Sequence, residues 1–309
     1  MKKSVCIMLT TCLLLSLLSG CAGLPAAASD KPSVVVTIYP VYDWVRNLLG
    51  ERAEDFDLLL LLDEGVDMHS FQPSVQDMVA VADADLLIYI GGESDEWIDE
   101  VEANKDTQRR LSLLEALGGA ALEEELAEGM QGEADGATDE HVWLSPKRAR
   151  VLCGALHEAL AALAPEEGRY LDAAWAAYDA RLAALDEAYE TALAAAAGDT
   201  LLVADRFPFR YLAEDYGLNY YAAFPGCEAE TEASFQTVSF LAGKLDELGI
   251  KTVLVLETGD GRLAETVIAA SRDRDQVVRT LHSLQGASGG KSYLTIMEEN
   301  LDVLREALG

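Results

Sequence analysis

Basic side chains are scarce in this sequence of 309 residues. Only 23 lysines and arginines stand against 54 aspartates and glutamates, which leaves a net charge of −31. Such a surface repels the phosphates of nucleic acids and the headgroups of anionic lipids, and it attracts cations. We therefore expect no nucleic-acid partner. The charge alone identifies no ligand, because an acidic surface also keeps a protein soluble.

Long apolar runs are equally scarce. One lies at the start, where the stretch from Cys6 to Leu18 follows two lysines and ends in small residues before Cys21. A basic start, a short apolar segment and a small-residue end predict a signal peptide at 1–21. Its last four residues resemble a bacterial lipobox, which implies that Cys21 is lipidated. Ordinary cleavage nearby is the alternative.

The rest of the chain has no apolar stretch of about 20 residues, the length that spans a membrane. We therefore expect an extracytoplasmic protein, in the periplasm or at the cell surface, that contacts membrane lipid through its N-terminal anchor. A Pro/Ala-rich tether at 22–32 joins the anchor to the folded body in this interpretation. Such a location excludes cytosolic metabolism.

Cysteine is also scarce. After Cys21 the chain contains only Cys153 and Cys227. Export permits a disulfide between them. However, Cys153 lies in a helical pattern beside Leu152 and Leu156, so a buried free thiol is the simpler interpretation. The disulfide stays open as an alternative.

Apolar segments alternate with helical ones, which predicts the α/β class with parallel sheets covered on both faces. We expect two lobes, each with its own core. The expected strands are 34–39, 56–62 and 86–90 in an N-terminal lobe at 33–164, and 201–204, 220–223, 252–256 and 277–281 in a C-terminal lobe at 198–309.

One helical segment is much longer than the others. Between Pro165 and Ala197 the only glycine is Gly168, and apolar residues recur at helical spacing. We expect one helix at 165–197, about 45 Å long at 1.5 Å per residue. It is either a long core helix or a rigid strut that joins the lobes. Open α/β sheets bind ligands beyond the carboxyl ends of their strands, so a strut places the site in the cleft between the lobes.

The segment 121–140 has many carboxylates and several glycines but no basic residue and no histidine. This composition predicts a mobile loop. The loop either is simply solvated or raises the local concentration of cations, with little selectivity among them.

Histidine occurs only four times, and three of the four lie where this fold predicts a site. His69 follows the second expected strand, His141 precedes a helix, and His282 closes the last expected strand. His157 lies within a helix and is expected to be structural. Three imidazoles from distant segments suit a borderline-soft divalent ion such as Zn²⁺, although each histidine taken alone is more often structural.

Five local segments resemble, in order, the zinc/manganese-binding lipoproteins of bacterial ABC importers (cluster A-I, periplasmic solute-binding protein family 9). These segments are 36–42, 65–74, 139–146, 209–218 and 292–301. The resemblance implies two α/β lobes joined by a long rigid helix, with the metal in the cleft between the lobes. It implies a protein that captures Zn²⁺, less readily Mn²⁺, and delivers it to an ABC permease in the membrane, and that is not an enzyme.

The resemblance assigns His69 and His141 as the two ligands from the N-terminal lobe. The C-terminal lobe departs from the family pattern. Arg206 stands where relatives usually have His or Glu, and an arginine cannot ligate a cation. His282 stands where relatives usually have Asp. We therefore expect His69, His141 and His282 to be metal ligands.

The fourth ligand stays open. Asp205, beside Arg206, is the first candidate, and Glu257 at the end of a strand is the second; water is an alternative to both. Asp205 is equally well explained by a salt bridge to Arg206 or Arg210. Three nitrogens with at most one carboxylate favour Zn²⁺ over Mn²⁺. Glu140, next to His141, is a candidate for orienting a neighbouring ligand.

Two other classes of function are weighed against metal delivery. A zinc hydrolase needs an open coordination position and a general base, for which Glu257 or Glu140 would serve. The chain has neither a His-Glu-x-x-His nor a Gly-x-Ser-x-Gly pattern, which counts against that class. A surface adhesion protein stabilised by a structural metal is the third class, and it predicts that the protein unfolds when metal is removed.

Overall fold

The computed structural model describes residues 31–62, 65–132, 136–227, 232–285 and 288–309, and within it Pro32–Gly309 forms one compact unit. The predicted signal peptide, its lipidation site at Cys21 and nearly all of the tether lie outside the described residues. Among the helices of the described part, none is both long and apolar enough to cross a membrane.

The N-terminal sheet has four parallel strands in the order β2-β1-β3-β4. Val34 of β1 is paired with Leu58 of β2 on one side and with Leu86 of β3 on the other. The two central strands are buried on both faces, as expected for a parallel sheet between helices. The strands are β1 (Ser33–Val36), β2 (Asp57–Leu60), β3 (Leu86–Tyr89) and β4 (Arg109–Ser112). The sequence prediction missed β4, because this edge strand opens with two exposed arginines.

The C-terminal sheet is also parallel and has the order β6-β5-β7-β8. Its strands are β5 (Thr200–Phe207), β6 (Asn219–Pro225), β7 (Thr252–Leu256) and β8 (Val277–Leu281). All four lie where the sequence places them, and β5 and β6 extend further. Two four-stranded parallel sheets of the same kind confirm the predicted α/β class.

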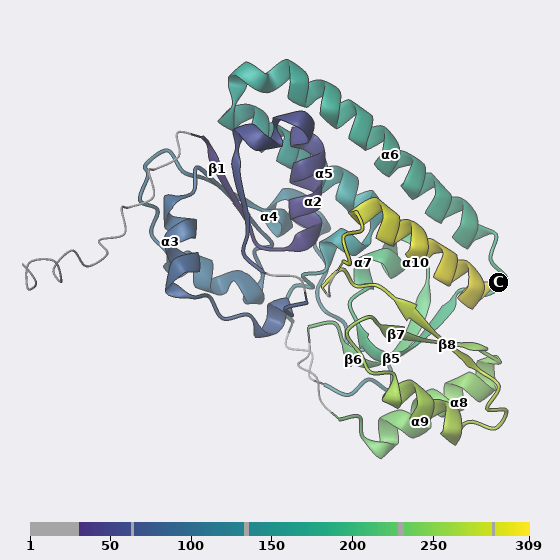
Figure 1. Cartoon of the computed structure of the whole chain (residues 1–309). Coiled ribbons are helices and arrows are strands. Elements are labelled where there is room, and N and C mark those ends of the chain that lie inside the picture. The colour runs from purple at the N-terminus through teal and green to yellow at the C-terminus, as the bar shows by residue number, and fades with distance from the viewer. Residues whose placement is uncertain (1–30, 63–64, 133–135, 228–231, 286–287) are drawn as a thin grey trace, which may run out of the picture. The chain divides into compact units, whose positions relative to one another are not determined.

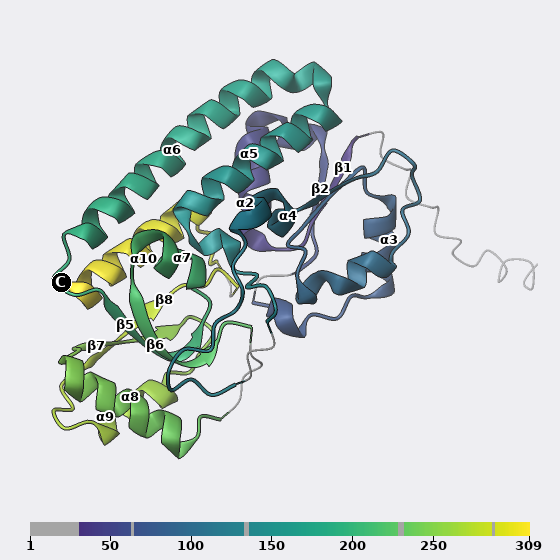
Figure 2. The same ribbon diagram turned by 180° about the vertical axis from the view of Figure 1, so that it is seen from behind.

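Helices cover both sheets and connect their strands (Figures 1 and 2). The α-helices are α2 (Tyr39–Leu49), α3 (Val75–Asp83), α4 (Leu113–Leu117), α5 (Pro146–Leu163), α6 (Gly168–Ala194), α7 (Arg210–Tyr216), α8 (Phe235–Leu248), α9 (Arg262–Ala270) and α10 (Tyr293–Leu308). Short 3-10 turns include η2 (Met68–Ser70), η3 (Glu93–Glu100), η5 (Val142–Leu144) and η6 (Pro165–Glu167).

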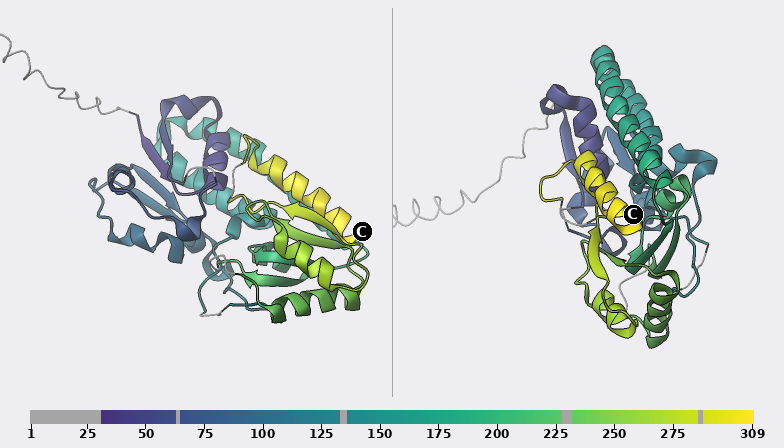
Figure 3. Two further views of the ribbon diagram at one scale, coloured as in Figure 1. Left: turned by 60° about the horizontal axis from the view of Figure 1, so that its bottom comes forward. Right: turned by 90° about the vertical axis from the view of Figure 1, so that its right-hand side faces the viewer.

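Helix α6 runs along both lobes, as Figure 3 shows from two further sides. It packs on α2 and α5 of the N-terminal lobe and on α7 and α10 of the C-terminal lobe. One stripe of its side chains is buried, from Leu171 through Tyr178 and Leu185 to Leu193, at helical spacing. At 1.5 Å per residue its 27 residues span about 40 Å. The rigid strut, rather than a helix inside one lobe, is therefore the correct interpretation.

The cores of the two lobes are not separate, which corrects the sequence prediction. One apolar cluster runs from the N-terminal sheet, through the faces of α5, α6 and α10, to one face of the C-terminal sheet. A second, smaller cluster lies on the other face of that sheet, beneath α8 and α9. The cores merge because α6 and α10 bury side chains against both lobes. The fold therefore holds the lobes together through shared apolar packing.

The described part of the acidic segment 121–140 has almost no regular structure, as predicted, but it makes contacts that were not predicted. Leu122 N–H donates to the Tyr211 hydroxyl, 3.0 Å away, and Glu125 lies 3.2 Å from Arg210. The Gln131 N–H donates to the Ala223 carbonyl of β6 over 2.8 Å. These contacts attach the segment, which precedes His141, to the C-terminal lobe.

Candidate metal centre

His69 is held by the turn that follows β2. Asp67 caps η2, and its Oδ1 accepts a hydrogen bond from the His69 N–H over 2.9 Å. This cap orients the short turn, and the His69 ring projects from it toward His141. The sequence placed His69 just past the second strand, at the carboxyl edge of the sheet, and the structure agrees.

His141 is the N-cap of η5, immediately before α5, and it is completely buried. Asp139 Oδ1 accepts from the His141 N–H at 2.8 Å and lies 3.1 Å from its Nδ1. Gly226 passes close to the ring on the other side, because a Cβ atom there would lie 3.1 Å from His141 Cε1. The ring is therefore fixed by the carboxylate behind it and by a glycine backbone beside it.

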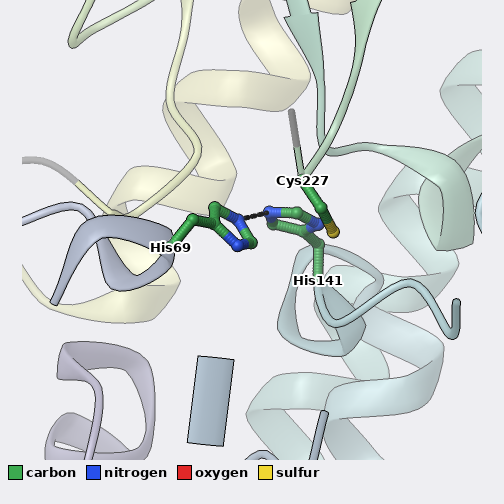
Figure 4. Close-up of side chains that lie close together, drawn as sticks. All are labelled: His69, His141 and Cys227. Carbon is green, nitrogen blue, oxygen red and sulfur yellow. Dashed lines mark hydrogen bonds between the residues drawn. The ribbon is translucent and has the colours of Figure 1, made fainter. Parts of the chain in front are cut away.

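The two imidazoles face each other through their Nε2 atoms, which are 3.2 Å apart (Figure 4). The Ser94 hydroxyl donates to Glu140 Oε2 over 2.5 Å and so accepts from His69 Nδ1, at 3.0 Å. Asp139 accepts from His141 Nδ1 in the same way. With both Nδ1 protons taken up, neutral rings present the lone pairs of both Nε2 atoms to one point.

Burial and neighbouring charges shift the pKa values of His69 and Asp67. Burial and the adjacent His141 lower the pKa of His69 to about 3; Asp67 opposes this change and Arg206 adds to it. Burial raises the pKa of Asp67, but the charge and hydrogen bond of Arg206 outweigh it, so that pKa lies below its usual value. At neutral pH the His69 ring is thus uncharged and able to donate its lone pair to a cation.

Cys227 completes a group that the sequence did not predict. Its Sγ and one ring nitrogen of each histidine, His69 and His141, all lie within 4.8 Å of one another. Cys227 follows β6, and Figure 4 shows it beside His141. Burial raises the pKa of the Cys227 thiol well above its usual range, with neighbouring carboxylates adding to the effect. The signal in the sequence is its position after a strand of the parallel sheet, a position equally open to a disulfide partner.

Three residues predicted from the sequence are not members of this group. His282 Nδ1 lies 4.0 Å from Glu257 Oε1, and Glu257 also accepts from the Ser283 N–H, at 2.8 Å. Asp205 accepts from two backbone N–H groups, those of Arg206 at 2.9 Å and Leu256 at 3.1 Å. Within the described residues, the grouping of His, Cys, Asp and Glu atoms that can hold a metal contains none of the three. Their role as ligands stays a prediction.

Arg206 faces the other lobe. Its side chain is buried, and its Nη2 donates to Asp67 Oδ2 over 2.7 Å. Since Asp67 also holds the backbone of His69, this ion pair connects the C-terminal sheet directly to the turn that carries a metal-ligand candidate. Arg206, which stands at a position where the resemblance implies a ligand, therefore contacts the turn that positions His69.

Three smaller predictions agree with the structure. His157 is structural, since its Nε2 lies 2.9 Å from Asp172 Oδ1 and its ring stacks on Trp175. Cys153 is a buried free thiol in α5, and Cys227 is also free. Glu140 does contact a histidine, as proposed from the sequence: its Oε2 lies 3.5 Å from His69 Nδ1.

The substitution Glu140→Gln tests this contact. We expect Zn²⁺ affinity to fall by about 10- to 100-fold, the usual effect of removing a carboxylate that orients a histidine ligand. Glutamine keeps the shape but has only one acceptor oxygen for the two bonds that Ser94 donates to Glu140. Competition titration with a chromophoric chelator measures the change. Glu96→Gln, on the wall of the same cavity, is the matched control and should stay within about threefold.

Similar proteins were found by sequence. Zinc-binding protein AdcA of Streptococcus pyogenes is 28% identical over 295 residues, covering 90% of this chain and 56% of its own length. High-affinity zinc uptake system protein ZnuA of Bacillus subtilis is 26% identical over 297 residues, covering 94% of this chain and 92% of its own length. The chain thus spans a little over half the length of its AdcA relative.

Solved structures show the same architecture. The Zn(II)-bound ZnuA-like domain of Streptococcus pneumoniae AdcA matches with a TM-score of 0.72 at 26% identity, over 90% of this chain and 99% of that one. Periplasmic zinc binding protein TroA from Treponema pallidum matches with a TM-score of 0.75 at 22% identity, over 90% and 99%, and bears on the fold alone. A family model described as zinc-uptake complex component A, periplasmic, matches residues 34–307. That match covers nearly the whole folded body, and the chain therefore belongs to this zinc-uptake family.

Proposed function

We propose that this protein captures Zn²⁺ outside the cytoplasm and delivers it to an ABC permease. One observation carries the proposal: His69 Nε2 and His141 Nε2 are 3.2 Å apart, with their Nδ1 protons directed elsewhere. A tetrahedral Zn²⁺ with Zn–N bonds of 2.0–2.1 Å requires two nitrogens about 3.3 Å apart. The two side chains are thus already at the separation that the ion requires.

The relatives support the choice of ion and the location. The similar AdcA and ZnuA proteins are named for zinc, and a Streptococcus pneumoniae relative at 29% identity is named a zinc-binding lipoprotein. We accordingly propose that Cys21 is lipidated and that the protein is anchored to the membrane. Mn²⁺ is the less favoured cargo, because two imidazoles suit Zn²⁺ better than an ion that prefers oxygen ligands.

The ligands proposed from the N-terminal lobe are His69 and His141. His282, predicted from the sequence, is the only predicted histidine ligand in the C-terminal lobe, but it lies against Glu257 and outside the group of His69, His141 and Cys227. Asp205 is the weakest of the predicted ligands, because both its oxygens already accept backbone N–H groups. A water molecule is the remaining choice for an open position.

Calorimetric titration of the purified protein and of His282→Ala with Zn²⁺ and Mn²⁺ tests the proposal. We expect one Zn²⁺ per chain, bound more tightly than Mn²⁺. We expect His282→Ala to weaken Zn²⁺ binding by less than about tenfold, because His282 pairs with Glu257 outside the histidine group. A larger loss would instead place His282 among the ligands. Failure of the unsubstituted protein to bind Zn²⁺ would contradict the proposed function.

We propose further that the protein binds and releases metal without catalysing a reaction. The hydrolase alternative predicts turnover of simple esters or phosphates that a chelator abolishes. The adhesion alternative predicts that a chelator unfolds the protein. Since one apolar core is continuous across both lobes, we expect a folded apo form whose unfolding free energy rises by about 4 kcal/mol when Zn²⁺ is present at a thousand times its Kd.

A further inference from the structure

Cys227 lies where the C-terminal lobe approaches both histidines. It directly follows Gly226, whose backbone packs against the His141 ring, and its own N–H donates to Glu124 Oε1 over 2.8 Å. The acidic segment and the His141 side chain thus fix the backbone of Cys227 from two directions. Its Sγ completes the group with His69 and His141.

We propose that Cys227 is a metal ligand and that its thiolate determines the preference of this site for Zn²⁺ over Mn²⁺. The inference rests on the proposed function, since it concerns the same ion. On binding, the S–H bond breaks, the proton passes to solvent, and the sulfur donates an electron pair to Zn²⁺ without any change in oxidation state. Soft thiolate ligands select Zn²⁺, whereas Mn²⁺ favours carboxylate and water.

The distances are compatible with one ion. Tetrahedral Zn²⁺ with Zn–S of about 2.3 Å and Zn–N of about 2.05 Å holds sulfur and nitrogen about 3.6 Å apart. The ligand atoms here lie within 4.8 Å of one another, so the separation between Sγ and a ring nitrogen must shorten by at most about 1.2 Å.

The charged groups around the site are already paired with one another or with the histidine rings. Arg206 brings a buried positive charge to the vicinity of His69 and pairs it with Asp67. The carboxylates of Asp139 and Glu140 lie behind the two rings and hold their Nδ1 atoms, where they orient the ligands. The thiolate of Cys227 would contribute negative charge in direct contact with the ion.

The sulfur is also reachable from solvent. Cys227 and His69 line one cavity of about 470 Å³, together with Ser94, Glu96 and Glu140. His141 closes the inner end of the site, since it is completely buried. An incoming cation therefore meets carboxylates, a histidine nitrogen and a cysteine sulfur in the same cavity.

Cobalt substitution tests the proposal on the purified full chain. A thiolate bound to Co²⁺ produces an intense charge-transfer band in the near ultraviolet, which nitrogen and oxygen ligands do not. We expect the band in the unsubstituted protein and in the control Cys153→Ala, and its loss in Cys227→Ser. The same Cys227→Ser variant should show a ratio of Zn²⁺ to Mn²⁺ affinity at least about tenfold lower.

Alkylation mapped by peptide mass spectrometry provides a second readout that needs no variant. Zn²⁺ should protect Cys227 from iodoacetamide, and a chelator should restore its labelling. A cobalt complex without the band, or Zn²⁺ that leaves Cys227 labelling unchanged, would overturn the inference. If Zn²⁺ is still bound tightly in that case and His69→Ala weakens it, the proposed function stands and only the ligand role of Cys227 fails.

Discussion

Replacing His69 or His141 by alanine should weaken Zn²⁺ binding by at least about a hundredfold in each case, the largest change in affinity that we expect from any single substitution. Removing a group that only orients a ligand already costs about 10- to 100-fold, so removing the ligating nitrogen itself should cost more. Both variants leave the other Nε2 without its partner at 3.2 Å. Calorimetry or chelator competition measures the loss.

The two variants should differ in stability. His69 stands on a short turn, whereas His141 is completely buried against Asp139. His141→Ala leaves that buried carboxylate with one partner fewer, at a cost of about 1–3 kcal/mol, so its thermal unfolding must be measured alongside binding. His157→Ala is the control, because His157 pairs with Asp172 in another part of the chain. Equal affinities for His157→Ala and His69→Ala would contradict the site.

Tyr293→Ala should produce the largest loss of stability, about 3–5 kcal/mol, because it empties a fully buried aromatic position. Tyr293 begins α10 in the C-terminal lobe and packs edge-on against Trp44 of α2, with ring centroids 5.1 Å apart. Its hydroxyl donates to the Trp143 carbonyl over 2.8 Å. The side chain therefore belongs to the apolar packing shared by the two lobes.

Tyr293→Phe separates the hydrogen bond from the packing. It should cost about 1–3 kcal/mol, since the buried Trp143 carbonyl loses a donor while the ring stays in place. Urea unfolding in the presence of a chelator measures both variants without the contribution of bound metal. Phe235→Ala, at a position 86% exposed, should change stability by less than about 0.5 kcal/mol. A cost below about 1 kcal/mol for Tyr293→Ala would show that the lobes are not held together there.

Patterns within short segments were enough to predict most of the fold. The strands β7 and β8 agree residue for residue with the prediction, although only β7 is buried throughout, whereas β8 includes the exposed Arg279. The long helix was evident from an interval nearly free of glycine and proline. The edge strand β4 escaped because edge strands need not be apolar.

The candidate site, like the fold, was predicted only in part from the sequence. His69 and His141 were identified from their positions after a strand and before a helix, together with the resemblance of their neighbours to a known family. The sequence alone, through its charge, its helix and strand periods and these local signals, thus determined the fold class and the kind of ligand, and it predicted two of the three residues in the candidate group.

Only the tertiary structure placed Cys227 beside the histidines and directed Arg206 toward Asp67. It also merged the two predicted cores into one through α6 and α10. These contacts join residues far apart in the chain, and their distances depend on how whole lobes pack against each other. A hydrophobic period reports which face of an element is buried, but many packings satisfy the same period, so it cannot report which residue the opposite lobe brings to within bonding distance.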